Sequence, residues 1–300
     1  MGPRAVPHIQ DDLVQRAGLA EQDLPVAALY VVALPLGNAA DITLRACWVL
    51  SRVDAIAAED TRVTAPLLAR FGVATPLIAA HRHNERAAAE GILARLAAGE
   101  RVALVTDAGT PGVSDPGALI VRAALDAGYR VVPLPGASSV VAAVSAAGLV
   151  APGFRFVGFL PHAARERSRA LRSIAAGAGA TVLFEAPHRI ATLLEELASV
   201  LAPERRVVIA RELTKKFESI RALKASELER MQAEARGEYV VIVDAAEAET
   251  EPVLDDSGRR WLDALLDELT PGRAAAIVSR MTGVPRAAIY ELALGLRNKR

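Results

Sequence analysis

Four short polar clusters contain the residue types that could carry acid–base chemistry or bind anions. They are "EDTR" (59–62), "HRHNE" (81–85), "EAPHR" (185–189) and "RELTK" (211–215). Carboxylate, imidazole and ammonium groups can exchange a proton with a substrate, whereas guanidinium groups stay charged and bind phosphate or carboxylate. Each cluster begins within or just after an apolar run of strand type, and α/β proteins place their ligands at the carboxyl ends of strands. We therefore expect these clusters to lie around one cleft.

A purely structural interpretation competes with the chemical one. Asp60 or Thr61 could cap a helix that begins there, and His81 and His83 could be solvated residues ahead of a helix capped by Asn84. The candidates for an acid–base group are Lys215, Glu59 and Asp60. The candidates for binding the substrate are Arg62, His83, Asn84, Arg189 and Arg211.

Three loops of small residues follow strand-like runs: "LPLGN" (34–38), "DAGTPGVSDPG" (107–117) and "PGASS" (135–139). Glycine permits a positive φ and has no Cβ, so a flat ligand can lie against the backbone of such loops. Tight turns required only by the topology are the alternative. The sequence has no G-x-x-x-x-G-K-[ST] motif and no G-x-G-x-x-G motif opening the first helix. These loops therefore predict a ligand with an adenosine-like plane and no phosphate group to anchor.

The elements that would position these loops read as two α/β domains. Apolar runs separated by helical patterns predict a doubly wound parallel sheet over 28–135. A second series over 136–246 contains two adjacent strand candidates with no helix between them, 205–212 and 217–223, which predicts an antiparallel hairpin and a mixed sheet. The first series of strands is predicted at 28–34, 55–59, 75–80, 101–107 and 129–135, and the second at 154–160, 181–186, 205–212, 217–223 and 239–246.

Three further segments flank the two domains. Residues 1–27 show no clear periodicity and are expected to be a loosely ordered N-terminal extension. Residues 247–258 have the acidic, Pro- and Gly-punctuated composition of a linker. Residues 259–300 predict a small helical tail of three short helices.

Composition narrows the class of protein. The 300 residues are 52% hydrophobic with a formal net charge of zero, and the single cysteine, Cys47, excludes an internal disulfide. No stretch has the length and apolar composition of a membrane span, so we expect a cytoplasmic protein. Residues 155–224 hold 13 Lys and Arg against 7 Asp and Glu. This local excess could form one basic face, although arginines that only solvate helices are the alternative.

Eight blocks of the sequence, in this order, resemble the ribosomal RNA small-subunit methyltransferase I family of the tetrapyrrole-methylase superfamily. They cover residues 28 to about 245, and the helical tail is also similar to that of the family. The blocks are "LYVVALPLGNAADITLRA", "AAEDTRVTAPLLARFG", "HRHNE", "LVTDAGTPGVSDPG", "LPGASSVVAAVSAAGL", "FVGFLP", "FEAPHRI" and "ARELTKKFE".

The resemblance implies S-adenosylmethionine held between two α/β domains, in a homodimer, and methylation of a cytidine ribose 2′-hydroxyl in the decoding centre of 16S ribosomal RNA in the small subunit. The superfamily's G-D-P motif is replaced here by "GTP" (109–111), so Thr110 offers a hydrogen bond but no charge. By position, the residues expected to contact the cofactor are Leu34, Pro35, Asp107, Gly109, Thr110, Val113, Ser138, Ser139, Ala186, Leu213 and Glu238.

Methyl transfer to a hydroxyl needs alignment and a group that helps the hydroxyl lose its proton, and we expect no metal to be required. Two other functions remain open. A tetrapyrrole (precorrin or uroporphyrinogen) C-methyltransferase of the same fold would bind a porphyrinoid in the cleft. A noncatalytic ribosome-assembly factor would have no use for S-adenosylmethionine.

Overall fold

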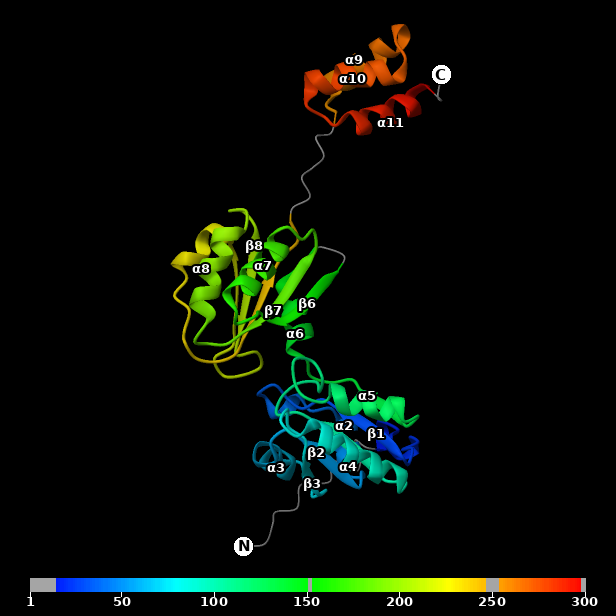
Figure 1. The fold of residues 1–300 in the computed structure, drawn as a ribbon, viewed down its shortest axis with the longest axis vertical. Coiled ribbons are helices and arrows are strands. Elements are labelled where there is room, and N and C mark those ends of the chain that lie inside the picture. Colours follow the sequence, from blue (N-terminus) through cyan, green and yellow to red (C-terminus); the bar gives the residue numbers. More distant parts are fainter. Residues whose placement is uncertain (1–14, 151–152, 247–253, 298–300) are drawn as a thin grey trace.

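The computed structural model describes residues 15–150, 153–246 and 254–297. Figure 1 shows two α/β domains in succession and a small helical unit at the C-terminal end of the chain. The expected fold class, two α/β domains with a helical tail, is confirmed. Within the described ranges, none of the helices combines the length and apolar composition needed to cross a bilayer.

The first domain is built on a parallel sheet with strand order β3-β2-β4-β1-β5. Three of its strands, β1, β2 and β4, are apolar and almost entirely buried because helices cover both faces. Strands β1 and β4 are neighbours, so the loops that follow them meet at one edge. The strands are β1 (Ala28–Val32), β2 (Ala55–Ala58), β3 (Leu77–Ala79), β4 (Arg101–Val105) and β5 (Arg130–Leu134).

The helices of this domain form two layers. The first layer packs with one face of the sheet around Trp48 and Leu68, and the second packs with the other face around Ile92 and Ile120. The first layer consists of η2 (Ala39–Asp41), α2 (Leu44–Leu50) and α3 (Thr61–Arg70), and the second of α4 (Glu85–Ala97) and α5 (Ala118–Asp126).

The described part of the predicted N-terminal extension packs on the first domain. A short 3-10 helix, η1 (Leu19–Glu21), places Leu19 in the hydrophobic core, and Leu24 packs against the same core. The hydroxyl of Tyr30 donates a hydrogen bond to the carbonyl of Pro25 at 2.7 Å. The prediction of loose order is therefore wrong for residues 15–27, since isolated apolar residues without periodicity still bury surface; residues 1–14 lie outside the described residues.

The second domain has a mixed sheet with strand order β6-β7-β10-β8-β9. Strands β6 and β7 are parallel, β8 and β9 form the predicted antiparallel hairpin, and β10 is antiparallel to both of its neighbours. Because β10 runs opposite to β7, it begins at the edge where β7 ends. The strands are β6 (Phe154–Phe159), β7 (Ala180–Glu185), β8 (Arg206–Arg211), β9 (Ser219–Lys224) and β10 (Tyr239–Val243).

Helices also cover both faces of this sheet. Helix α6 packs on one face, with Val140 and Ala143 against Val208 and Val240. The other face carries Leu171 of α7 and the leucines of α8. The elements are α6 (Ser139–Ala147), α7 (Ala164–Ala175), α8 (Ile190–Val200) and the 3-10 helix η3 (Ala225–Arg230).

The tail is a three-helix unit with its own core of small and branched residues, including Leu262, Val278 and Ile289. Its first helix begins before the predicted end of the acidic linker, because Asp255 caps it by accepting a hydrogen bond from the Gly258 amide at 2.7 Å. Residues 247–253 of that linker lie outside the described residues. The helices are α9 (Asp256–Glu268), α10 (Pro271–Thr282) and α11 (Arg286–Arg297).

Candidate functional site

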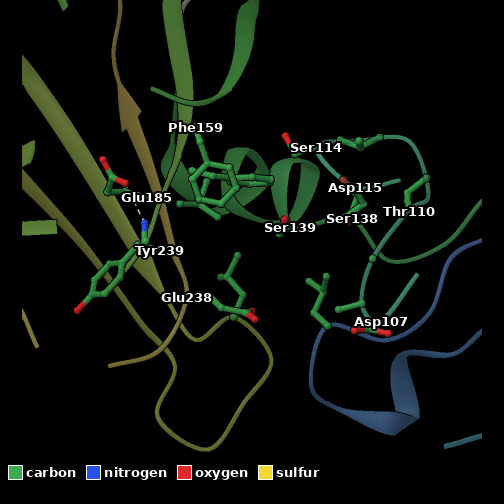
Figure 2. Close-up of a pocket in the computed structure, with 18 of the residues that line it drawn as sticks. Asp107, Thr110, Ser114, Asp115, Ser138, Ser139, Phe159, Glu185, Glu238 and Tyr239 are labelled. Carbon is green, nitrogen blue, oxygen red and sulfur yellow. Dashed lines mark hydrogen bonds between the residues drawn. The ribbon is translucent and has the colours of Figure 1, made fainter. Parts of the chain in front are cut away.

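A cleft of about 420 Å³ lies between the two α/β domains, within the range typical of small-molecule sites. The first domain contributes the loops that follow β1, β2, β4 and β5, and the second contributes the ends of β6 and β7, the loop after β8 and the start of β10. Figure 2 shows Asp107 and Glu238 on opposite sides of this cleft. The carboxyl ends of the parallel strands therefore meet the second domain where the sequence predicted a ligand site.

Hydrogen bonds at Gly109 and Thr110 fix the first part of the loop at 107–117. The Leu34 amide donates to the Gly109 carbonyl at 2.9 Å, and the Gly109 amide donates to the Leu34 carbonyl at 2.8 Å. Gly109 has a φ of +70°, a conformation that strains any other residue. The Thr110 hydroxyl donates to the carbonyl of Ala137 at 2.9 Å, which joins this loop to the loop after β5.

Only one of the three glycine loops places a glycine in the cleft. Gly109 lines the cleft, whereas Gly37 and Gly136 do not. A Cβ at Gly136 would lie 2.8 Å from the Cβ of Ala33, and a Cβ at Gly37 would overlap the side chain of Lys215. These two glycines therefore permit close packing within the protein rather than contact with a ligand.

Five acidic residues line the cleft: Glu59, Asp107, Asp115, Glu238 and Glu185, the last of which is paired with Arg167 and Arg189. Burial raises the pKa of Glu59 and of Asp107. Burial, together with repulsion by Glu59 and Asp107, raises the pKa of Asp115 to about 6. This negative lining favours a cationic ligand, because a positive charge would relieve the repulsion among the carboxylates.

The first two of these carboxylates are also tied to the neighbouring backbone. The Asp60 amide donates to Oδ1 of Asp107 at 3.1 Å, and the Asp107 amide lies 3.5 Å from Oε2 of Glu59. No hydrogen bond to a described residue is made by the carboxylate of Asp115, which leaves it open to a ligand or substrate.

Asp60 takes the structural role that competed with catalysis. Its carboxylate caps α3 by accepting from the Arg62 amide at 2.8 Å, and it pairs with the Arg62 guanidinium at 2.7 Å. These bonds lower the pKa of Asp60 to about 2, which makes it a poor proton acceptor at neutral pH. Neither residue lines the cleft, and the Arg62 side chain is 88% exposed.

Lys215 lies beside the cleft rather than in it. Its Nζ donates to Oε1 of Glu212 at 3.0 Å and to Oε2 of Glu238 at 3.1 Å, and Glu238 does line the cleft. Burial opposes the charge of the lysine, but these two hydrogen bonds outweigh it and raise the pKa of Lys215. The lysine is therefore a fixed cation that holds Glu238, and a role as general base is disfavoured.

The two arginines predicted to bind phosphate in the second domain are occupied by protein groups. Arg189 is 17% exposed and pairs with Glu185 at 3.2 Å, and Arg211 is 13% exposed and pairs with Glu234 at 2.6 Å. Ion pairs of this kind fix the ends of β7 and β8 and leave little guanidinium surface for RNA.

In the cluster after β3, Asn84 and Glu85 make structural hydrogen bonds, whereas His83 faces solvent. The Asn84 carboxamide accepts from the His81 amide at 2.8 Å and donates to the Ala79 carbonyl at 3.1 Å, so it closes the turn and makes no cap bond to α4. His83 is exposed. The buried Glu85 accepts from the amides of Gly117 and Leu119 at 2.8 and 2.9 Å, which anchors the far end of the 107–117 loop.

Most residues expected to contact a cofactor lie in the cleft. Leu34 and Pro35 are instead buried, with the Leu34 side chain in the core of the first domain, and Leu36 takes their place in the cleft. Those that line it are Asp107, Gly109, Thr110, Val113, Ser138, Ser139, Ala186, Leu213 and Glu238.

The sequence interpretation missed several lining residues that stand inside the quoted motifs. Asp115 lies in "DAGTPGVSDPG", and Glu185 opens "EAPHR". The rings of Phe159 and Phe184 pack edge to face with centroids 5.6 Å apart and form an aromatic wall. Aromatic side chains beside strand ends were the available signal, since such rings can stack on the flat part of a ligand.

Two families match the chain. The tetrapyrrole (corrin/porphyrin) methylases match residues 28–229, and the RsmI C-terminal HTH domain matches residues 252–297. The first match runs from β1 to η3 and so includes every strand except β10, and the second covers the three-helix tail.

Curated relatives match over nearly the whole chain. A ribosomal RNA small subunit methyltransferase I from Neisseria meningitidis serogroup B is 43% identical over 275 residues, covering 90% of this chain and 94% of the relative. The protein of the same name from Pseudomonas aeruginosa is 44% identical over 281 residues, covering 92% of this chain and all of the relative.

Solved structures share the fold at lower identity. The methyltransferase CobJ aligns with a TM-score of 0.55 at 24% identity, covering 73% of this chain and 94% of its own. A uroporphyrin-III C-methyltransferase from Thermus thermophilus, complexed with S-adenosyl homocysteine, aligns with a TM-score of 0.53 at 21% identity, covering 72% of this chain and 97% of its own.

Proposed function

Because the chain belongs to the ribosomal RNA small subunit methyltransferase I family, within the tetrapyrrole methylases, we propose that it methylates the 2′-hydroxyl of a cytidine ribose in the decoding centre of 16S ribosomal RNA. S-adenosyl-L-methionine is the methyl donor. The proposal includes a homodimer working on small ribosomal subunits in the cytoplasm.

The observation that carries the proposal is the acidic and aromatic lining of the cleft. S-adenosyl-L-methionine has a sulfonium, an ammonium group and an adenine ring, and it carries no phosphate. The carboxylates of Asp107, Asp115 and Glu238 suit its positive charges, while Phe159 and Phe184 suit its ring. Gly109 presents backbone without a side chain to the cleft.

The bound cofactor supplies a methyl group on a sulfonium, which passes to the substrate oxygen by in-line displacement and leaves S-adenosylhomocysteine. The protein must orient the ribose and accept the proton that the 2′-hydroxyl loses. Among the three acid–base candidates of the sequence, Glu59 alone lines the cleft, and Asp115 is a second carboxylate placed to accept a proton. Both have a raised pKa caused first by burial, which makes each a better base than an ordinary carboxylate.

The experiment that tests the proposal is incorporation of tritiated methyl groups into 16S ribosomal RNA, free and in 30S particles, followed by nuclease and alkaline mapping. A 2′-O-methyl group removes the nucleophile of alkaline cleavage, so one ladder position in the decoding region should be protected. Label on a base, or no label on the RNA, contradicts the proposal.

The tetrapyrrole alternative shares the fold but has no observation of its own in this cleft. The solved tetrapyrrole enzymes are 19–24% identical, which speaks for the fold alone, whereas the curated relatives cited above are 43–44% identical. A porphyrinoid that competes with RNA for methylation would favour the alternative. Binding to small ribosomal subunits without S-adenosyl-L-methionine binding and without methyl transfer would favour the noncatalytic assembly factor over both.

A further inference from the structure

An exposed row of arginines on α7 has no use in the fold. Helix α7 holds four arginines and one acidic residue, Glu166. Arg165, Arg169 and Arg172 are exposed, and their spacing of four and three residues places them on one face of the helix. The fourth, Arg167, is buried on the opposite face. We call the three exposed residues the α7 arginine row.

The guanidinium groups of the row lack carboxylate partners. They differ in this from Arg95, which pairs with Glu100, and from Arg206, which pairs with Asp244. Among the described residues, no ion pair is formed by Arg165, Arg169 or Arg172, and Arg172 makes only a hydrogen bond to the Ser168 hydroxyl at 2.6 Å. Arg165 also stands in the first turn of α7, where the helix dipole disfavours a cation, so helix stability does not explain it.

The buried face of α7 fixes the row relative to the cleft. Arg167 pairs with Glu185 at 3.0 Å and with Glu196 at 2.7 Å. Glu185 ends β7 and lines the cleft, and Phe159, which ends β6 just before α7, lines it too. The row therefore starts near the cleft mouth and runs about 10 Å along the helix away from it.

We infer that the α7 arginine row is the surface that binds phosphates of the RNA strand whose ribose enters the cleft. This inference rests on the proposed function and identifies where its substrate docks. Charge complementarity supports RNA as the occupant, since a rigid line of unpaired guanidinium groups matches a chain of phosphates. The row takes the phosphate-binding role that the sequence predicted for Arg189 and Arg211, whose guanidinium groups are already bound to carboxylates.

The test uses the full chain with Arg165, Arg169 and Arg172 all changed to Gln. We expect the Kd for 30S particles to rise about tenfold or more, and the slope of log affinity against log salt to become shallower by about 2. S-adenosyl-L-methionine affinity, measured by calorimetry, should stay unchanged. Changing the three arginines to Lys should preserve most of the binding, since the charge is retained.

A matched control removes the same charge from the edge of the first sheet opposite the cleft. Arg52, Arg70 and Arg130 are exposed and lie just before β2, at the end of α3 and at the start of β5. Their triple change to Gln should leave the Kd and the salt slope near the wild-type values. An equal loss in this control means that net charge alone acts, and overturns the assignment of the row.

The remaining outcomes distinguish an error in assigning the α7 arginine row from an error in the proposed function. If the wild type methylates particles and the α7 variant matches its Kd and salt slope, the row is wrong and the proposed function stands. If the variant loses binding to particles but binds protein-free 16S ribosomal RNA normally, the row contacts a ribosomal protein and the RNA assignment is overturned. If the wild type neither binds nor methylates particles, the proposed function fails, and the row falls with it as an RNA surface.

Discussion

The side chain of Lys215 lies directly over Gly37, so the second domain contacts the first at a position where only glycine leaves room. Beside it, the Asn38 amide donates to the Thr214 hydroxyl at 3.2 Å. The same lysine holds Glu238 at the cleft. The packing at Gly37 therefore helps to set the position of a cleft carboxylate that lies 201 residues away.

Gly37→Ala should lower the single-turnover methylation rate by about tenfold or more, because the new methyl group displaces the lysine stem and with it Glu238. The thermal midpoint should change little, since Gly37 does not have a positive φ. Gly91→Ala is the matched control, as a Cβ there meets nothing within 4 Å. A Gly37→Ala enzyme with the wild-type rate would show that the lysine position is irrelevant.

Lys215→Met should retain particle binding but lower the single-turnover rate by roughly 10²-fold, because Glu238 loses the cation that holds it at the cleft. Lys215→Arg should recover part of the rate because it keeps the cation. Since its hydrogen bonds to Glu212 and Glu238 raise the pKa of Lys215, the lysine stays charged through the neutral range. The wild-type pH–rate profile should therefore show no rising limb from this lysine; such a limb, lost in Lys215→Met, would make it the base.

Cofactor affinity should depend on pH through Asp115. Burial first, and then repulsion by Glu59, Asp107 and Glu238, raises its pKa to about 6 against the opposing effect of Arg82. The carboxyl is neutral below that pKa and negative above it, so the Kd for the cationic cofactor should fall roughly three- to tenfold from about pH 5 to about pH 7.5. Calorimetry on Asp115→Asn should show no such step, whereas Asp126→Asn, at the exposed end of α5, should keep it.

Arg167→Met should reduce the free energy of unfolding by about 3 kcal/mol, measured by urea denaturation, because the Glu185 side chain is 0% exposed and would lose one of its two arginine partners. Arg169→Met, on the exposed face of the same helix, should change it by less than about 0.5 kcal/mol. Equal effects of the two changes would mean that the buried pair contributes nothing specific.

Deleting residues 250–300 should raise the KM for 30S particles and leave S-adenosyl-L-methionine affinity intact. The three tail helices share a core of their own, and the residues that line the cleft all precede 241. Titration of the truncated chain with the cofactor checks this. Lost cofactor binding would mean that the tail helps to build the cleft.

The strands were predictable from sequence because each is a short apolar run bounded by turn residues. Strand ends were less so: β4 was expected to reach Asp107 but ends at Val105, since Asp107 turns to accept a hydrogen bond from Asp60. The place of β10 between β7 and β8 could not be read from its own residues, because it depends on pairing with strands distant in the chain.

The loops that form the site were predictable from the sequence, but the chemical role of each charged side chain was not. Gly109 and Thr110 were found because small residues after a buried strand mark a ligand edge. The roles of Asp60 and Lys215 depended on partners, Arg62 and Glu238, that decide whether a charged group is free to act. Asp115 was missed because its burial and unpaired carboxylate arise only from tertiary packing.

The central position of β10 also sets when the cleft can exist during synthesis. The first sheet is complete once Leu134 has left the ribosome, so the first domain can fold while the rest of the chain is still being made. The second sheet has a gap between β7 and β8 until Val243 emerges, and Glu238, Tyr239 and Val240 arrive with that strand. A nascent chain therefore cannot complete this cleft until the last strand of the second sheet has been made.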